Sequence, residues 1–217
     1  MNTITVASDE YREYASITTR HPYNLILNLI LRYLTPNPNP CYYLYNQPRP
    51  TYNASPLQIT QITMPVLKVV AKISDQFPCL TDVLYVQNIT GTISSQDPKY
   101  PFEAVITSGH DVIRTTKSGQ TAILDAVLVG HLKDSDKKFL MKYSGHLNFS
   151  PELVEVLTGK KTEHGPPGNV KSFGTIELDE EAKDDKESWV VGQTMVGNGR
   201  FFRDGEDLFV EYLTEFM

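Results

Sequence analysis

Short apolar runs separated by turn residues at nearly regular spacing fill the chain from about Pro56 to its end. Each run has the length of a strand, and such spacing is typical of an antiparallel sandwich or barrel. We expect strands at residues 66–73, 83–93, 102–108, 121–132, 138–149, 171–178, 187–202 and 208–216. Asp97-Pro98, Ser118-Gly119 and Asp204-Gly205 are among the turn residues between them. The pattern predicts one all-β domain over residues 56–217.

One short helix is expected within this β pattern, at SPELVEVLTG (residues 150–159). Ser150 can cap its amino end, Pro151 suits the first turn and Gly159 suits the end.

Residues 1–55 differ in composition and lack the strand pattern, and we expect them to form an amino-terminal extension. The segment HPYNLILNLILRYL predicts a short helix, and TPNPNPCYYLYNQPRP predicts irregular, polyproline-like chain. Two interpretations stay open: an irregular arm lying on the domain, or a cover in which Tyr42, Tyr43 and Tyr45 close a barrel mouth or contact a neighbouring subunit. Both a monomer and a homodimer built through this arm are compatible with the sequence.

The strand at 121–132 has two largely apolar faces, one of which carries Asp125, Val127 and Val129. We expect that face to line the barrel interior. Burying a carboxylate costs several kcal/mol unless it is hydrogen-bonded or protonated, so Asp125 would need compensation. It is interpreted either as an anchor for a backbone donor or as a catalytic acid or base.

Two further strands are predicted to complete an apolar pocket. In the strand at 138–149, Tyr143 shares a face with apolar residues, either as a satisfied core tyrosine or as a general acid or hydrogen-bond donor. In the strand at 187–202, Gly197 and Gly199 leave space on one face. That face also carries Trp189, Val191, Gln193 and Met195.

Charge and composition exclude several classes of function. A net charge of -6 and a pI near 5.4, with no basic cluster, argue against a nucleic-acid partner. The first residues lack the pattern of an export signal, and the apolar stretch 25–34 is too short to cross a bilayer, so we expect a cytoplasmic protein without a membrane span. Two cysteines and five histidines show no metal-ligand spacing, so no metal and no cofactor are expected.

Four stretches resemble the family known as domain of unknown function 3237, over residues of about 56–217. They are QNITGTI, SGHDVI, LDAVLVG with KYSG, and WVVGQTMVGNGRFF with VEYL. The resemblance implies a calycin-like or lipocalin-like antiparallel β-barrel with an internal pocket. It also implies that Asp111, Asp125, Tyr143, Trp189, Gly197 and Gly199 occupy family positions.

The chain departs from that family at two positions. Val127 stands where the family commonly has Arg, and Val191 stands where it has Asn, which would make the pocket more apolar and leave Asp125 without its usual partner. His110, next to Asp111 in an expected turn at the barrel mouth, is interpreted as an exposed turn residue or as a ligand contact.

Two functions follow as hypotheses. The first is a cofactor-independent isomerase or cyclase, with a pericyclase as one variant, acting on a hydrophobic intermediate of secondary metabolism. Asp125 or Asp111 would be the acid or base, Tyr143 and Gln193 the hydrogen-bond donors, and Val127, Trp189 and Met195 the shaping wall. The second is a non-catalytic carrier of a hydrophobic small molecule.

Overall fold

The computed structural model describes residues 64–162, 168–182 and 185–217, so the predicted extension of residues 1–55 lies outside the described residues. The strands are β1 (Val66–Ile73), β2 (Asp75–Leu80), β3 (Val83–Gln87), β4 (Thr90–Ser95), β5 (Glu103–Thr115), β6 (Thr121–Leu132), β7 (Lys138–Asn148), β8 (Val170–Leu178), β9 (Met195–Asp204) and β10 (Asp207–Phe216). One α-helix, α3 (Pro151–Leu157), follows β7, and two 3-10 helices, η2 (Glu180–Ala182) and η3 (Ser188–Val190), follow β8.

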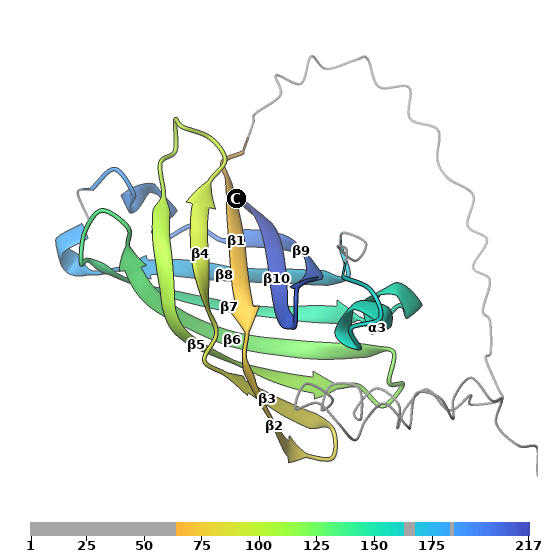
Figure 1. Cartoon of the computed structure of the whole chain (residues 1–217). Helices are drawn as coiled ribbons and strands as arrows, with labels where there is room; N and C mark the ends of the chain where they lie inside the picture. Colours follow the sequence, from red (N-terminus) through yellow and green to blue (C-terminus); the bar gives the residue numbers. More distant parts are fainter. Residues whose placement is uncertain (1–63, 163–167, 183–184) are drawn as a thin grey trace, which may run out of the picture.

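Eight of these strands close into an antiparallel barrel, as predicted (Figure 1). The order around the ring is β5-β4-β1-β10-β9-β8-β7-β6, and β6 pairs with β5 to complete it. The strands β2 and β3 form a hairpin that continues β1 and β4, and β3 pairs with the last residues of β5. The break between β3 and β4 lies at Asn88, which has a positive φ of 57°. The sequence pattern predicts one strand there and misses β2.

Alternate side chains of the strands point into the barrel and are buried. Leu67, Ile93, Ile106, Leu124 and Leu128 are examples, each at most 2% exposed. This alternation of buried and exposed positions is the property from which the strands can be predicted.

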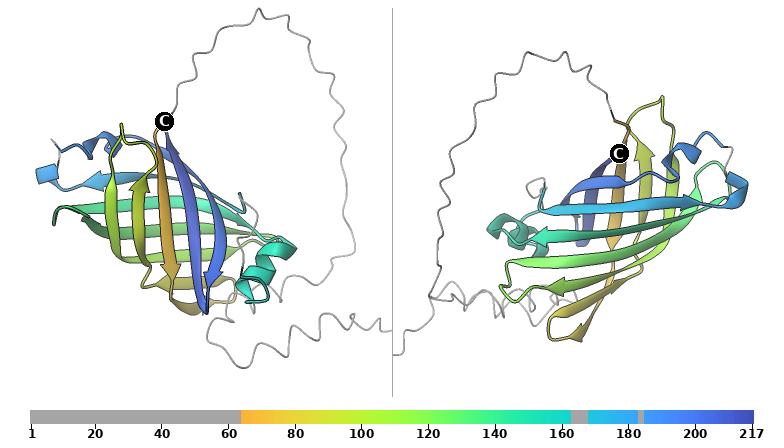
Figure 2. Two further views of the ribbon diagram at one scale, coloured as in Figure 1. Left: turned by 45° about the horizontal axis from the view of Figure 1, so that its top comes forward. Right: turned by 180° about the vertical axis from the view of Figure 1, so that it is seen from behind.

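The helix α3 covers one end of the barrel, here called the helix end (Figure 2). Ser150 Oγ accepts a hydrogen bond from the Leu153 amide at the amino end of the helix, as predicted. At its carboxyl end, the Arg203 guanidinium of β9 donates to the carbonyls of Val156 (2.7 Å) and Leu157 (2.8 Å). Four apolar side chains of α3 are buried, so this short helix is held by tertiary contacts.

Among the described residues, no helix has both the length and the apolar character that a membrane crossing requires.

Candidate functional site

The structure corrects the predicted orientation of β6. Asp125 and Val129 are exposed and Val127 is half-buried, whereas Ala122, Leu124, Ala126 and Leu128 are buried. Both faces of this strand are apolar, so a period of two does not reveal which one is inside. The cost of burying a carboxylate favours the observed choice, in which Asp125 is on the outer wall and its Oδ1 accepts a 3.4 Å hydrogen bond from Ser144. Asp125 and Val127 therefore do not belong to the interior site.

The predicted strand over residues 187–202 begins only at Met195, so the predicted face of Trp189, Val191 and Gln193 does not exist. Trp189 lies in η3, and Val191 is 43% exposed. The Gln193 amide donates to the Trp189 carbonyl at 2.6 Å, which fixes a turn rather than a pocket wall. Only the carboxyl-terminal part of the prediction is correct, because Met195, Gly197 and Gly199 are buried on the inward face of β9.

Trp189 closes the barrel end opposite to α3, here called the tryptophan end. Its ring contacts Tyr100, Phe102 and Phe216, with centroid distances of 5.5, 6.5 and 4.9 Å. Its indole N–H donates to the Pro101 carbonyl at 2.9 Å. Trp189 is thus an end plug that packs against the core.

A β-bulge determines that Asp111 faces the interior. The pairing of β5 with β6 shifts register between Ile106 and Ser108. Before the bulge the buried residues of β5 include Ala104 and Ile106, and after it they are Gly109, Asp111, Ile113 and Thr115. The extra residue exchanges the faces of the strand. His110 consequently lies on the outer face, where its ring is 5.9 Å from that of Tyr85, and the prediction that His110 and Asp111 lie in a turn is wrong.

The Asp111 carboxyl group is buried among polar backbone groups and has an unusual protonation equilibrium. Its Oδ1 accepts the backbone N–H of Asp125 at 3.0 Å. Burial, which disfavours the charged form, raises the pKa of Asp111 from 3.8 to about 7, with a smaller rise from the charge of Asp125. Hydrogen bonds from the Asp125 and Val112 amides oppose this rise. Near neutral pH, Asp111 can therefore both accept and donate a proton.

Two phenols share the interior with Asp111. Tyr143 is buried on β7 as predicted, and its ring centroid lies 5.6 Å from that of Tyr212 on β10. Burial raises the pKa of both phenols above the ordinary value, and the Asp111 charge raises both further. Both groups consequently stay protonated at neutral pH. A hydrogen bond between the two side chains raises the pKa of Tyr143 and lowers that of Tyr212, so Tyr143 is the donor within the pair and Tyr212 keeps a proton to donate.

Tyr212 fills the space that the two glycines of β9 leave. A Cβ atom added at Gly199 would lie 2.7 Å from ring carbons of Tyr212, and one at Gly197 would lie 2.6 Å from Ser172 Oγ. Tyr212 is not among the residues predicted for the site, although the alternation along VEYLTEF places it on the same face as Val210, Thr214 and Phe216.

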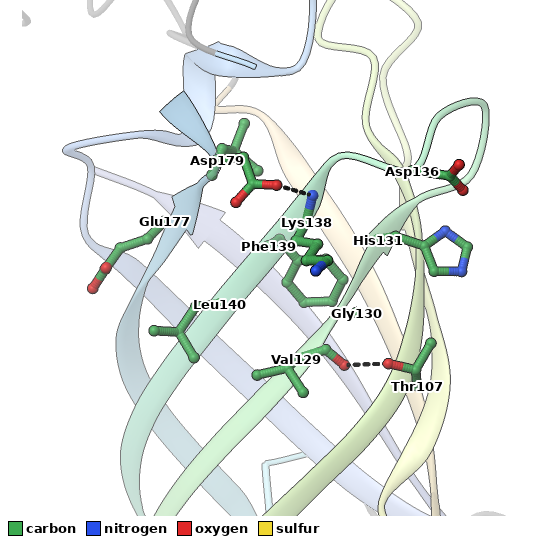
Figure 3. Close-up of a pocket in the computed structure, with 11 residues that line it drawn as sticks. Thr107, Val129, Gly130, His131, Asp136, Lys138, Phe139, Leu140, Glu177 and Asp179 are labelled. Atoms are coloured by element: carbon green, nitrogen blue, oxygen red, sulfur yellow. Dashed lines mark hydrogen bonds between the residues drawn. The ribbon is translucent and has the colours of Figure 1, made fainter. Parts of the chain in front are cut away.

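A groove of about 650 Å³ lies on the outer wall, away from this interior cluster (Figure 3). Val129, Leu140 and Lys138 are among its lining residues. Its Thr107 hydroxyl donates to the Val129 carbonyl at 3.3 Å, and its Asp179 carboxylate accepts the Lys138 amide at 2.8 Å. Both of these polar side chains hydrogen-bond to backbone groups of the strands. This indicates that they stabilise the sheet and do not bind a ligand.

A second groove of about 310 Å³ on the outer wall contains Asp125 beside Phe173, whose side chain is 58% exposed. Among the described residues, no three His, Cys, Asp or Glu side chains are grouped so as to hold a metal ion.

Comparisons with known proteins identify two similar solved structures and a family. One solved structure, a conserved protein of unknown function from Rhodopseudomonas palustris, is 16% identical, with a TM-score of 0.52 over 71% of this chain and 95% of that chain. A β-barrel-like protein from Acinetobacter baumannii is 18% identical, with a TM-score of 0.45 over 76% of this chain and 99% of that chain. No curated protein matches the chain. The family model described as "Protein of unknown function (DUF3237)" matches residues 63–214, and the chain therefore belongs to this family.

Proposed function

We propose that the protein is a cofactor-independent isomerase or cyclase whose hydrophobic small-molecule substrate, an intermediate of secondary metabolism, reacts inside the barrel. Asp111 is the proton-transferring group, Tyr212 is the hydrogen-bond donor to the substrate, and Tyr143 supports Tyr212 by donating to it. Asp125, Val127 and Gln193 have no part in this proposal, because their side chains do not join the interior cluster.

One observation carries the proposal: a buried carboxyl group with a pKa of about 7 shares a largely apolar interior with two buried phenols. A general acid or base works best when its pKa is close to the working pH. Burial of a carboxyl group is costly to stability, and groups with strongly shifted pKa values are frequent at functional sites.

The chemistry that fits these groups is a proton shift next to a carbonyl. The Asp111 carboxylate removes a proton from the carbon beside the carbonyl, and the electron pair of that C–H bond moves onto the carbonyl oxygen as an enolate. The Tyr212 phenol stabilises the enolate oxygen by a hydrogen bond, and the Tyr143 phenol strengthens that bond by donating to the Tyr212 oxygen. Where a second double bond is conjugated with the enolate, protonated Asp111 returns the proton to the far carbon of that double bond, and the carbonyl re-forms. For ring closure, the enolate carbon adds to a second carbonyl or an activated double bond of the same molecule, and Asp111 returns its proton to the atom that receives the electron pair. The product has the mass of the substrate, and no co-reactant is consumed.

Because mass is conserved, the reaction can be detected in a mixture without naming the substrate. A metabolite extract of the protein's own host is incubated with the purified full chain and analysed by liquid chromatography and mass spectrometry. We expect one compound to decline while a compound of identical mass appears at another retention time. Asp111→Asn should lower this conversion at least 100-fold, in the range typical of a lost general acid or base. The matched control is Asp125→Asn, which changes the exposed aspartate and should retain conversion. Equal conversion by Asp111→Asn and the unmodified protein would remove Asp111 from the mechanism.

Closure of the apolar interior at both ends, by α3 and by Trp189, favours a second candidate, a carrier that retains a hydrophobic molecule. Native mass spectrometry of protein purified from its host distinguishes the two functions. A ligand that stays bound and leaves chemically unchanged supports the carrier.

A further inference from the structure

Gln76 is a buried polar side chain without a hydrogen-bond partner among the described residues. It is 8% exposed, although the other five residues of β2 are exposed. Within the part of the chain that the structure describes, neither its amide nitrogen nor its amide oxygen has a hydrogen-bond partner. Most buried polar groups in folded proteins are paired, so an amide with both of its atoms unpaired requires an explanation.

The register of the sheet aligns Gln76 with the interior cluster. Gln76 pairs with Val86, Val86 with Asp111, Asp111 with Ala126, and Ala126 with Tyr143. Residues directly opposite each other in neighbouring antiparallel strands point to the same face of the sheet. These five paired residues form a row across the sheet. All five are buried, so the row lies on the inner wall.

Polar and small residues alternate along this row. Val86 separates Gln76 from Asp111, and Ala126 separates Asp111 from Tyr143. At about 4.8 Å per strand, the backbones of Gln76 and Asp111 are about 10 Å apart. The three polar groups are thus spaced over the length of a small molecule that lies across the short side chains of Val86 and Ala126.

We propose that Gln76 binds a carboxamide group of the ligand that occupies the barrel interior. This inference rests on the proposed function for the location of the ligand, and it adds the class of ligand. A primary carboxamide offers one donor and one acceptor side by side, which complements both unpaired atoms of the Gln76 side chain. A carboxylate offers acceptors only, and its charge would be buried near Asp111. A ketone or an ester leaves the amide oxygen of Gln76 unpaired.

The first test uses the ligand-free protein and its thermal unfolding. Gln76→Met keeps the length of the side chain and removes the unpaired amide, so we expect Tm to rise by about 2–4 °C. The matched control is Gln193→Met, which removes an amide that bonds the Trp189 carbonyl and should lower Tm. A lower Tm for Gln76→Met would mean that the amide has a partner, such as a fixed water, in the ligand-free protein, and would overturn the proposal.

The second test compares three probes of nearly equal shape: benzamide, acetophenone and benzoate. Binding to the full chain labelled with nitrogen-15 is followed by shifts of backbone amide signals. We expect benzamide to shift the signals of Gln76, Val86 and Asp111 and to bind at least tenfold more tightly than either other probe. Gln76→Met should remove this preference. Equal affinities of benzamide and acetophenone, or shifts confined to the outer wall, would overturn the proposal.

The two proposals fail in different measurements. If Asp111→Asn abolishes conversion while Gln76→Met leaves Tm and the preference for benzamide unchanged, the isomerase proposal is supported and the carboxamide site is rejected. If benzamide binds as expected and Asp111→Asn has no effect on conversion, the carboxamide site is supported and the role of Asp111 in catalysis is rejected.

Discussion

The indole N–H of Trp189 donates a 2.9 Å hydrogen bond to the carbonyl of Pro101, and this bond joins the segments that precede β9 and β5. The ring of Trp189 also contacts Phe102, directly after Pro101, and Phe216 at the end of β10. Three segments far apart in the sequence thus meet at one side chain at the tryptophan end.

Replacement of Trp189 tests this end plug. Trp189→Ala should lower the free energy of unfolding by about 3–5 kcal/mol, because it leaves a cavity and removes the bond to Pro101. Trp189→Phe keeps much of the apolar contact and should cost about 1–2 kcal/mol. Urea denaturation measures both values. The exposed Val191 gives the control, since Val191→Ala should change stability by less than about 0.5 kcal/mol. A similarly small effect of Trp189→Ala would show that the ring does not close the barrel.

The second prediction concerns Asp111 and the pH dependence of stability. Its pKa is raised from 3.8 to about 7 in the folded protein, so between these values the folded protein binds more protons at this group than the unfolded chain does. This carboxyl group therefore lowers the free energy of unfolding as pH rises from about 4 to 7, by roughly 4 kcal/mol in total at 1.36 kcal/mol per pKa unit.

Asp111→Asn lacks this titration. We expect the difference in unfolding free energy between Asp111→Asn and the unmodified protein to shift in favour of the variant as pH rises from 4 to 7 and to stay constant above pH 8. Denaturation curves at five pH values measure that difference. A difference independent of pH would contradict a raised pKa at Asp111.

The third prediction concerns the fit of Tyr212 over Gly199. A Cβ atom at position 199 would lie 2.7 Å from the Tyr212 ring, so Gly199→Ala should destabilise the protein by about 1–3 kcal/mol. In a Tyr212→Leu background the same substitution should cost less, because the ring carbons are gone. A double-mutant cycle measures this coupling, and Asn198→Ala at the exposed neighbouring position serves as the control. Strict additivity of the two changes would mean that the ring does not occupy this space.

The fourth prediction concerns Glu211, whose carboxylate lies on the outer wall between Lys68 (2.7 Å) and Arg200 (2.6 Å). Burial tends to raise the pKa of Glu211, but hydrogen bonds from Lys68 and Arg200 outweigh it and lower the pKa below 4.5. The ion pairs therefore stabilise the protein above about pH 4.5, and this contribution is lost as pH falls through the lowered pKa.

Glu211→Gln should lower the free energy of unfolding by about 2 kcal/mol at pH 7 and by much less at pH 3. Glu215→Gln, at an exposed position of the same strand, should have little effect at either pH. Urea denaturation at both pH values provides the comparison. An equal loss at pH 3 and pH 7 would indicate that Glu211 acts through packing and not through its charge.

The sequence predicted the barrel well because most of its strands alternate between core and solvent. For β7 and β10 the apolar face is unambiguous, and Tyr143 was placed inside correctly. β6 is apolar on both faces, so the assignment of Asp125 to the interior had no support from periodicity and was wrong. In β2 only Gln76 is buried, so no alternation reveals this strand.

The candidate site was harder to predict because it depends on irregularities. Asp111 faces inward only because of the bulge between Ile106 and Ser108, and no residue pattern in VITSGHDVI identifies the position of an extra residue. The segment from Ser188 to Thr194 reads as a strand by composition, yet it forms η3 and a turn because Trp189 packs against rings from other elements. These contacts between distant segments override local preference.

The pairing of β1 with β10 has a consequence for how the protein is made. During synthesis β1 emerges before β2 to β9, and β10, the strand that covers its edge, follows them. Until then β1 through β9 form an open sheet with unpaired backbone groups at β1, a surface that can associate with other nascent chains. We therefore expect ring closure to wait until β10 has left the ribosome, so that a chaperone able to shield a free strand edge would raise the yield of folded protein.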